Sequence, residues 1–288
     1  MKKILITGKS SYIGTSFSRW VSQYPDKYAV DLISLREDEW KGKSFGGYDA
    51  VLHTVGIAHV DAKPEMEPLY YKVNRDLAVE TARKAKKDGV KQFVFLSSII
   101  VYGESGPING SKIIDRNTVP EPANFYGDSK LQAEEGIKSL ESNDFRVAIV
   151  RPPMIYGKGS RGNYPKLARA ARLLPVFPDV DNRRSMLHID NLCEFLRLII
   201  DHEDRGIFFP QNKEYVCTSE MVRLIAETHG KKIMLTKIFN PLLKLAAPKI
   251  GLVNKVFGSY VYERSLSEYK VDYRVKDLKQ SIIATERQ

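Results

Sequence analysis

Cysteine is scarce in this chain. Only Cys193 and Cys217 occur among its 288 residues, which excludes a disulfide-stapled scaffold and a cysteine-rich zinc or iron–sulfur site. We expect two reduced thiols and no bound metal. Long apolar runs are missing too, since no stretch reaches the roughly 18 residues that span a bilayer, and the run after Met1 is too short for a secretory signal. We therefore expect a cytoplasmic protein.

Neither sign of charge is rare, but cations are in excess. The sequence has 45 Lys and Arg against 35 Asp and Glu, a net charge of +10. Such an excess suits nucleic acid, an acidic membrane surface or an anionic small molecule. The densest basic cluster, Arg83–Lys87, falls at the expected end of a helix, where cations complement the helix dipole. We therefore expect no nucleic-acid partner.

Short apolar runs alternate with helical patterns through the first half of the chain. This alternation predicts the α/β class, with a Rossmann-type doubly wound parallel sheet covered by helices on both faces. The expected strands are 3–7, 28–35, 50–54, 92–97 and 146–150, and the expected helices include 69–87 and 124–140.

The pattern becomes less regular after Arg151-Pro152-Pro153. We expect a first domain at 1–155 and a smaller, mixed C-terminal domain at 156–288, with segments such as 184–205 able to return to the first. Helices are expected at 165–174, 190–202, 218–229 and from 240 onward, with Asp190, Thr218 or Ser219, and Asn240 as their N-caps.

A glycine loop follows the first strand and precedes a helix. Its sequence is Gly8-Lys9-Ser10-Ser11-Tyr12-Ile13-Gly14. Small residues at positions 8, 11 and 14 allow a tight turn and a close approach of backbone to a pyrophosphate at the helix N-terminus. The loop therefore predicts a dinucleotide site, with an ordinary strand-to-helix turn as the alternative.

The residues after the second strand should contact the adenosine ribose. Arg36 stands near the strand end and Lys9 lies in the glycine loop. Cations there suit the 2′-phosphate of NADP, whereas a carboxylate would hold the ribose of NAD. NADP is slightly favoured; the alternative is that both cations are simply exposed and that Glu37 or Asp38 binds NAD.

A tyrosine and a lysine share one face of the helix expected at 124–140. Tyr126 and Lys130 are four residues apart, which places them one turn from each other. A phenol with an ordinary pKa near 10 needs a nearby cation to act as a base at neutral pH. Ser97 and Ser98 end the fourth strand at the sheet edge where such folds bind ligands. The Tyr-x-x-x-Lys spacing alone is common, and its combination with the serines and the glycine loop makes it informative.

Together these motifs resemble the extended short-chain dehydrogenases, specifically the nucleotide-sugar epimerase and dehydratase group. The resemblance covers nearly the whole chain. It depends on Thr7-Gly8-x-x-Ser11-x-x-Gly14, Leu52-His53-Thr54-Val55-Gly56, Ser97-Ser98-Ile99-Ile100-Val101-Tyr102-Gly103, Tyr126-x-x-x-Lys130 and Arg151-Pro152-Pro153-Met154-Ile155-Tyr156-Gly157.

The resemblance implies a role for each matching residue. Ser98, Tyr126 and Lys130 would be catalytic, with Ser98 and Tyr126 also touching the substrate and Lys130 also holding the nicotinamide ribose. The first domain would bind NAD(P) and the second the substrate. Cofactor contacts are expected from Gly8, Lys9, Ser10, Ser11, Tyr12, Ile13, Gly14, Arg36, Val55, Gly56, Asn74, Ser97, Tyr126, Lys130 and Pro153. The chain departs from the family pattern at Ser11, which replaces a glycine, at Thr54-Val55-Gly56, and at Met154, where many 4-epimerases carry an asparagine.

Two segments of the second half resemble substrate-binding segments of the family. The stretch Arg183–Asp190 resembles one whose arginine binds a nucleotide diphosphate, which points to Arg184. Asn163 matches an asparagine on the same diphosphate, with helix capping as the alternative. His188 is expected to be structural. A polyanionic cofactor and substrate would account for the positive net charge.

The segment Ile238–Tyr262 mixes apolar and basic residues. We expect a helical lid on the substrate domain, with an interfacial amphipathic segment as the alternative; membrane contact is not the expectation. The residues concerned are Leu242, Leu243, Leu245, Leu252, Val253, Val256, Phe257, Lys244, Lys249 and Lys255.

The resemblance implies hydride transfer at C4 of a nucleotide sugar, with a UDP-hexose favoured and a 4-epimerase of the UDP-glucose type leading. The main alternative is an NADPH-dependent 4-keto-sugar nucleotide reductase, which Lys9 and Arg36 favour. A 4,6-dehydratase is disfavoured because the string at the catalytic serine is Ser97-Ser98-Ile99. A non-catalytic nucleotide-binding member would not need Ser98, Tyr126 and Lys130 together. A homodimer is the assembly that we consider.

Overall fold

The computed structural model describes residues 1–58, 63–108, 110–247 and 251–287, and its chain forms two compact units. The first comprises residues 1–103, 119–152 and 192–210, and the second comprises 104–118, 153–191 and 211–288. A single cut at residue 155 does not separate them, because residues 104–118 belong to the second unit. The segment that returns to the first unit is 192–210 rather than 184–205.

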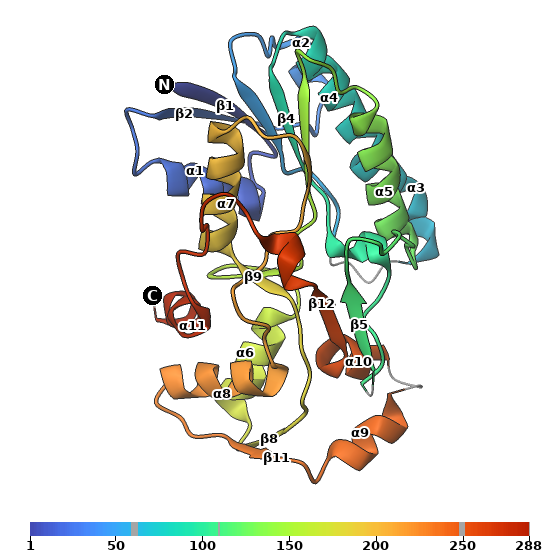
Figure 1. Ribbon diagram of the computed structural model, residues 1–288, viewed down its shortest axis with the longest axis vertical. Helices are drawn as coiled ribbons and strands as arrows, with labels where there is room; N and C mark the ends of the chain where they lie inside the picture. Colours follow the sequence, from blue (N-terminus) through green and yellow to red (C-terminus); the bar gives the residue numbers. More distant parts are fainter. Residues whose placement is uncertain (59–62, 109, 248–250, 288) are drawn as a thin grey trace. The chain divides into compact units, whose positions relative to one another are not determined.

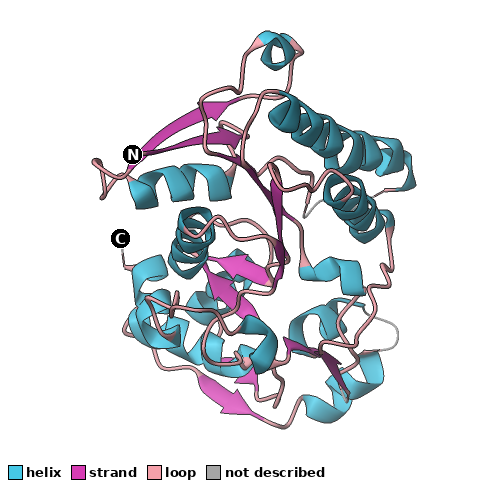
Figure 2. Ribbon diagram, turned by 45° about the horizontal axis from the view of Figure 1, so that its top comes forward, coloured by secondary structure: helices cyan, strands magenta, loops and turns pink. Residues whose placement is uncertain are grey.

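The first unit is built on a six-stranded parallel sheet (Figures 1 and 2). Its order is β10-β6-β4-β3-β1-β2. The two strands that follow β1 in the chain, β2 and β3, therefore lie on opposite sides of β1. Thr7 pairs in register with Ile33 of β2 and with His53 of β3, which brings three carboxyl ends to one edge. The strands are β1 (Lys2–Thr7), β2 (Tyr28–Ile33), β3 (Ala50–His53), β4 (Gln92–Leu96), β6 (Arg146–Val150) and β10 (Gly206–Phe208).

Helices cover both faces of this sheet, as the alternating pattern predicts (Figure 2). Helices α1 (Tyr12–Val21) and α7 (Ile189–Asp201) lie on one face, where Trp20 donates to Glu194 at 3.0 Å. The other face carries α3 (Glu67–Tyr70), α4 (Leu77–Lys87) and α5 (Phe125–Lys138). Two short elements, α2 (Glu39–Gly42) and the 3₁₀ helix η1 (Pro64–Met66), lie in the connections.

The helix expected at 69–87 is interrupted by a π-helical segment, η2 (Tyr71–Asp76), between α3 and α4. Tyr70, Asn74 and Ala78 are buried, so one side of the interrupted helix faces the interior along its length. The segment thereby turns a polar side chain, Asn74, into the interior.

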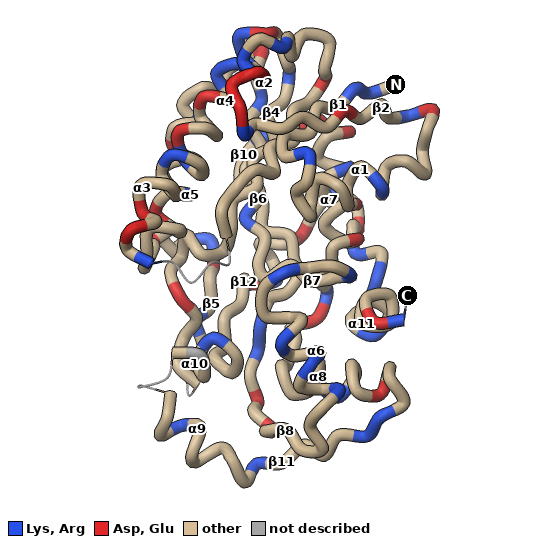
Figure 3. The backbone as a smooth tube through the Cα atoms, turned by 180° about the vertical axis from the view of Figure 1, so that it is seen from behind, with Lys and Arg blue, Asp and Glu red and all other residues tan. Residues whose placement is uncertain are grey.

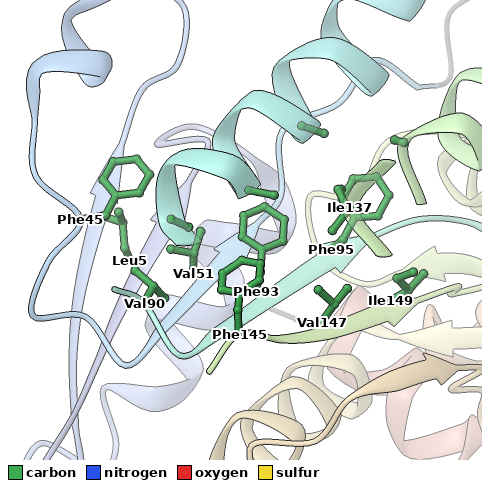
Figure 4. Packing of buried hydrophobic residues seen from close by; sticks show 14 of the residues in the cluster. Leu5, Phe45, Val51, Val90, Phe93, Phe95, Ile137, Phe145, Val147 and Ile149 are labelled. Carbon is green, nitrogen blue, oxygen red and sulfur yellow. The ribbon is translucent and has the colours of Figure 1, made fainter. Parts of the chain in front are cut away.

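Aromatic and branched side chains of the sheet pack against small residues of α4 and α5 (Figure 4). Phe93, Phe95 and Phe145 are at most 1% exposed. Alanines on the two helices let their backbones approach the sheet closely. The helix residues of this core are Ala78, Ala82, Ala85, Ala133 and Ile137.

The second unit is mixed, with three two-stranded parallel ladders and a set of helices around its own core. The ladders are β7 (Met154–Tyr156) with β9 (Met186–His188), β8 (Val176–Pro178) with β11 (Met234–Thr236), and β5 (Ser111–Ile114) with β12 (Ser259–Tyr262). The helices are α6 (Tyr164–Leu173), α8 (Thr218–Thr228), α9 (Asn240–Ala246), α10 (Gly251–Phe257) and α11 (Leu278–Glu286), and a 3₁₀ turn, η4 (Arg264–Ser267), follows β12.

The expected N-caps of α8 and α9 are wrong. Cys217 is the N-cap of α8, and the Thr218 hydroxyl donates to Val256 O at 2.8 Å instead of capping. Phe239 is the N-cap of α9, while the amide of Asn240 donates to Asp179 O at 2.8 Å. The side chains that the local sequence predicts as N-caps thus form hydrogen bonds with distant carbonyl groups instead.

Asp190 is not an N-cap either, because α7 begins one residue earlier and Asp190 lies in its first turn. No helix within the described ranges is long and apolar enough to cross a membrane. The same ranges contain no cluster of three or more His, Cys, Asp or Glu side chains able to hold a metal ion.

Candidate active site

The glycine loop joins β1 to α1 at the carboxyl end of β1, between the ends of β2 and β3, which flank β1 in the sheet. Gly8 has φ +103°, and a Cβ there would lie 3.0 Å from Thr54 Oγ1. A Cβ on Gly14 would lie 2.7 Å from Ser11 Oγ and 2.9 Å from Thr54 Oγ1. Both positions therefore require glycine, because a methyl group at either would press on the loop or on the end of β3.

Ser11, which stands where the family has its middle glycine, caps α1. Its Oγ accepts from Gly14 N at 2.9 Å and is bonded to Thr54 Oγ1 at 2.6 Å. The first turn of α1 contains no acidic residue, so the free N–H groups there suit an anion. The cradle fits the pyrophosphate of a dinucleotide, because it combines tight glycines with a helix N-terminus that has no acidic residue and a serine whose hydroxyl is hydrogen bonded within the protein.

The two cations expected to select the cofactor lie near the end of β2. Lys9 N donates to Ile33 O at 3.0 Å, and Arg36 follows Ile33 by three residues. Both side chains are exposed, and no ion pair among the described residues involves either one. Asp38 is bonded to Lys41 at 3.0 Å, whereas Glu37 is exposed. The expected cations are thus gathered at one strand end.

Ser98, Tyr126 and Lys130 come together at the carboxyl edge of β4. Ser98 follows this strand and is the N-cap of η3 (Ile99–Tyr102), and its hydroxyl is hydrogen bonded to the Tyr126 phenol. Lys130, one turn beyond Tyr126 on α5, is 4% exposed and donates to Leu96 O at 2.9 Å. The side chains that the sequence selects therefore form one cluster in the first unit.

The surroundings shift both titrating groups of this cluster. Desolvation raises the pKa of the partly buried Tyr126 to about 12, although the hydrogen bond from Ser98 opposes the shift. Burial lowers the pKa of Lys130 to about 8, although the negative charge of Glu134 raises this pKa in part. The lysine thus titrates close to neutral pH, where a small change in its surroundings alters its charge.

The loop after β3 passes beside Lys130. A Cβ on Gly56 would lie 3.1 Å from Lys130 Nζ and 3.2 Å from Asn74 Oδ1, so a larger residue would crowd both side chains. Asn74 is fully buried, accepts from Ile57 N at 2.8 Å and donates to Ser129 Oγ at 3.2 Å. It therefore fixes this loop against α5 rather than leaving its amide free.

Sequence reasoning did not single out a buried polar network behind the cluster. Arg151 Nε lies 3.0 Å from Glu134 Oε1, and its Nη1 donates to Tyr102 Oη at 2.6 Å. The Ser97 hydroxyl also donates to Glu134, so contact of Ser97 with a cofactor would come from its main chain. The available signal was spacing: Glu134 lies eight residues after Tyr126 and four after Lys130, on the same helix face.

The second unit contains four of the expected residues, namely Pro153, Asn163, Arg184 and His188. Arg184 is partly buried, donates to Gly258 O at 2.8 Å, and has no ion pair among the described residues. Burial lowers its pKa, because the charged form loses hydration and gains no anionic partner among the described residues. Pro153 is the first residue of this unit in its stretch of chain and is buried.

Asn163 is the N-cap residue of α6, but its side chain makes no capping hydrogen bond. The alternative of a side-chain cap is therefore wrong. His188 is 2% exposed, and burial lowers its pKa to about 4. A histidine that stays neutral in the interior fits the expected structural role.

Comparison with known proteins agrees with this geometry. Residues 4–209 match the NAD dependent epimerase/dehydratase family. The UDP-glucose 4-epimerase of Vibrio cholerae is 30% identical over 94% of this chain and 87% of its own length. The N-acetyl-alpha-D-glucosaminyl-diphospho-ditrans,octacis-undecaprenol 4-epimerase of Escherichia coli O157:H7 is 25% identical over 88% of this chain and 81% of its own.

Among solved structures, the UDP-glucuronic acid 4-epimerase of Bacillus cereus, in complex with NAD, has a similar fold. It superposes with a TM-score of 0.75 at 16% identity and covers 99% of this chain and 97% of its own. The family binds NAD(P), and its members named here are epimerases. This chain belongs to the NAD dependent epimerase/dehydratase family and is an enzyme of that family.

Proposed function

We propose that this enzyme is a nucleotide-sugar 4-epimerase that inverts C4 of a UDP-hexose with NAD or NADP. The observation that carries the proposal is the Ser98–Tyr126–Lys130 cluster at the carboxyl edge of β4. A relative that is 30% identical over most of both chains is named as a UDP-glucose 4-epimerase, which supports the substrate class.

In the proposed reaction, Tyr126 removes the proton of the C4 hydroxyl while the Ser98 hydroxyl donates a hydrogen bond to the same oxygen. A nicotinamide cofactor held by the glycine loop would supply reversible hydride transfer at C4. Tyr126 then gives the proton back after the keto sugar has presented its other face. Atoms and charges balance over the cycle, so no external reductant is consumed.

Lys130 supplies the charge that makes the phenolate accessible. The pKa of Tyr126 near 12 makes the free phenol a poor base at neutral pH, so the deprotonated form needs a neighbouring cation. Lys130 stands one turn away, and its pKa near 8 leaves it largely protonated at pH 7. Formation of a phenolate would favour the protonated lysine further, since opposite charges stabilise each other.

The cofactor would lie along the cradle already described. The glycine loop would hold its pyrophosphate, Gly56 would allow its close approach to Lys130, and Lys9 and Arg36 would face the adenosine ribose. In the second unit, Arg184 would bind the diphosphate of the substrate, because it is a partly buried cation with no ion pair among the described residues. Asn163, whose side chain does not cap α6, would donate its amide to the same group.

Proton NMR of the sugar anomeric signals tests the proposal. Purified enzyme incubated with UDP-glucose or UDP-galactose, or their N-acetylated forms, should convert one C4 epimer into the other without net consumption of cofactor. Mass spectrometry of cofactor released from the denatured protein should detect tightly held NAD. If no UDP-hexose is converted by enzyme that binds NAD(P), the proposed substrate is wrong.

The second candidate is an NADPH-dependent reductase of a 4-keto-sugar nucleotide. The exposed cations Lys9 and Arg36 favour it, because both suit a 2′-phosphate. Stoichiometric loss of NADPH absorbance with a dTDP-4-keto-6-deoxy sugar, together with inactivity toward UDP-hexoses, would establish this candidate in place of the epimerase.

A lipid-linked sugar is a third substrate class for the same chemistry. The Escherichia coli O157:H7 relative is named for an undecaprenol-linked substrate. Undecaprenyl diphosphate N-acetylglucosamine in detergent, assayed beside UDP-N-acetylglucosamine, would distinguish the two classes by which one is epimerised.

A further inference from the structure

The second unit exposes an unusual concentration of large apolar side chains, which we name the apolar edge. It comprises Met234, Ile238, Phe239, Leu242 and Leu245, which lie in β11, in α9 and in the short connection between them. Ile238 is 82% exposed, Leu245 76% and Leu242 65%. Five such side chains fall within residues 234–245, a higher local density than the scattered single exposures found on most proteins.

The apolar edge is not an unfilled core position. Helix α9 already has an inward side: Leu243 packs on the core of the second unit, and Ala247, four residues later, is 4% exposed. Leu242 and Leu245 lie three residues apart on the opposite side, and Ile238 precedes Leu242 by four. The inner side of α9 thus packs on the second unit, while its outer side carries apolar groups that no part of the described chain covers.

The charge around the apolar edge has one sign. The 35 residues from Thr228 to Tyr262 contain six lysines and no Asp or Glu. Figure 1 shows α9 following β11 within this unit, and Figure 3 shows basic but no acidic positions from the end of β11 through α9. Lys237 and Lys244 are exposed, and no ion pair among the described residues involves either. Lys249 lies outside the described residues.

These features select the kind of partner. A second copy of this chain docked by the same edge would place lysines against lysines, which is unfavourable. An anionic bilayer complements both features at once, because apolar side chains enter the acyl boundary while lysines meet the headgroups. We propose that the apolar edge, with Lys237 and Lys244, docks this enzyme on the surface of an anionic membrane. The proposal does not depend on which sugar the enzyme converts.

Vesicle sedimentation with the full-length purified enzyme tests the proposal. One set of vesicles contains phosphatidylethanolamine and phosphatidylglycerol in a ratio of 7:3, and the other contains phosphatidylcholine alone. We expect binding to the anionic vesicles that weakens in high salt, and little binding to phosphatidylcholine.

Two double variants separate the apolar and the ionic contributions. Replacing Leu242 and Leu245 by Ser should reduce binding about tenfold or more, because it removes buried methylene groups. Replacing Lys237 and Lys244 by Gln should reduce it about 25-fold, or about fivefold for each charge. The matched controls are Val119→Ser with Val271→Ser and Lys43→Gln with Lys72→Gln, all exposed positions elsewhere on the chain.

The outcomes are distinct. Loss of binding in the edge variants but not in the controls supports the proposal. Failure of the wild-type enzyme to bind anionic vesicles overturns it, as does an equal loss in the control variants. A dimer in light scattering that the Leu242→Ser, Leu245→Ser variant dissociates, without vesicle binding by the wild type, would assign the edge to a second copy instead. Turnover of a soluble nucleotide sugar, measured in parallel, tests the proposed function independently.

Discussion

Arg151, directly after β6, holds Glu134 of α5 through three hydrogen bonds, with Nε 3.0 Å from Oε1 and 3.1 Å from Oε2, and Nη2 2.5 Å from Oε2. Both side chains are at most 5% exposed. Glu134 is one helical turn from Lys130, and its charge raises the pKa of that lysine against the effect of burial. The ion pair thus fixes a negative charge behind Lys130 and raises the pKa of this lysine beside Tyr126.

Glu134→Gln should therefore move the pH profile of the enzyme. Removing the negative charge lowers the pKa of Lys130 below about 8, so the cation beside Tyr126 is lost at a lower pH. We expect the alkaline limb of kcat/KM to shift to lower pH, and we expect an unfolding free energy about 3 kcal/mol lower because Arg151 keeps its charge.

The neighbouring exposed position gives the control for this variant. Glu135→Gln changes the same charge on the outer face of α5 and should leave both the profile and the stability nearly unchanged. A Glu134→Gln enzyme that is less stable but has an unmoved pH profile would leave the pair with a structural role only.

Lys130→Met should inactivate the enzyme but stabilise it at pH 7. The folded-state pKa of about 8 lies below the ordinary 10.5, so the unfolded state binds this proton more tightly, at a cost of about 3 kcal/mol that is fully present below pH 8. Losing the hydrogen bond to Leu96 O offsets part of the gain, which leaves a net of about 1–2 kcal/mol.

Urea unfolding at several pH values checks the sign of this prediction. The wild-type penalty fades as pH rises from 8 to 10.5, so the variant should lose its advantage over that range and become the less stable protein near pH 10. A variant that is less stable than wild type at pH 7 would show that Lys130 is not a desolvated cation.

Tyr126→Phe should lower kcat by at least about 10²-fold, the usual effect of losing a general acid/base group. The aromatic ring still packs edge-on against Tyr70, so folding and cofactor binding should be preserved. Tyr24→Phe, a partly buried tyrosine in the same unit, is the control. Activity within a few-fold of wild type in the Tyr126 variant would exclude the phenol from the reaction.

Arg36→Ala should weaken NADP(H) about 10- to 100-fold while changing NAD(H) little. An exposed guanidinium near the end of β2 can make a charged hydrogen bond to a 2′-phosphate that NAD lacks. Arg19→Ala, an exposed arginine at the far end of α1, controls for the loss of one positive charge. Fluorescence titration of both cofactors measures the effect, and equal losses for the two would exclude a phosphate contact.

The sequence predicts the parts of this fold that depend on local apolar patterns, but not the parts that depend on contacts between distant residues. The central strands were predictable because buried parallel strands read as continuous apolar runs, as in Phe93–Leu96. Strand β10 was missed because its three residues are too few for a pattern and two are exposed. The caps expected at Thr218 and Asn240 failed because distant carbonyl groups compete for their side chains.

In the candidate site, too, residues marked by local features were predictable and residues that depend on tertiary packing were not. Ser98, Tyr126 and Lys130 are recognisable because their spacing and strand-end positions are local features. Glu134 and Arg151 were not recognisable, since isolated charged residues normally face solvent and only the packing of α5 on β6 buries the pair. Asn74 was expected from the family resemblance, but no simple periodicity indicates the π turn that buries it.

Arg184 provides the test that separates a nucleotide-sugar enzyme from other dehydrogenases of this fold. It is a partly buried cation in the second unit, bonded to Gly258 O and without an ion pair among the described residues. Binding of a diphosphate would supply the missing anion. UDP alone should therefore raise the melting temperature of the wild-type protein, because a ligand that binds only the folded state stabilises it.

Arg184→Ala should largely abolish the protection by UDP while leaving the shift caused by NAD(P) intact, since the glycine loop lies in the other unit. Arg183→Ala removes an equal charge from the adjacent exposed position and should keep the UDP shift. In turnover, loss of Arg184 should lower kcat as well as raise KM, because binding energy from the remote diphosphate helps to orient the reacting sugar. If no nucleoside diphosphate at millimolar concentration shifts the wild-type melting temperature, the proposed substrate class is wrong.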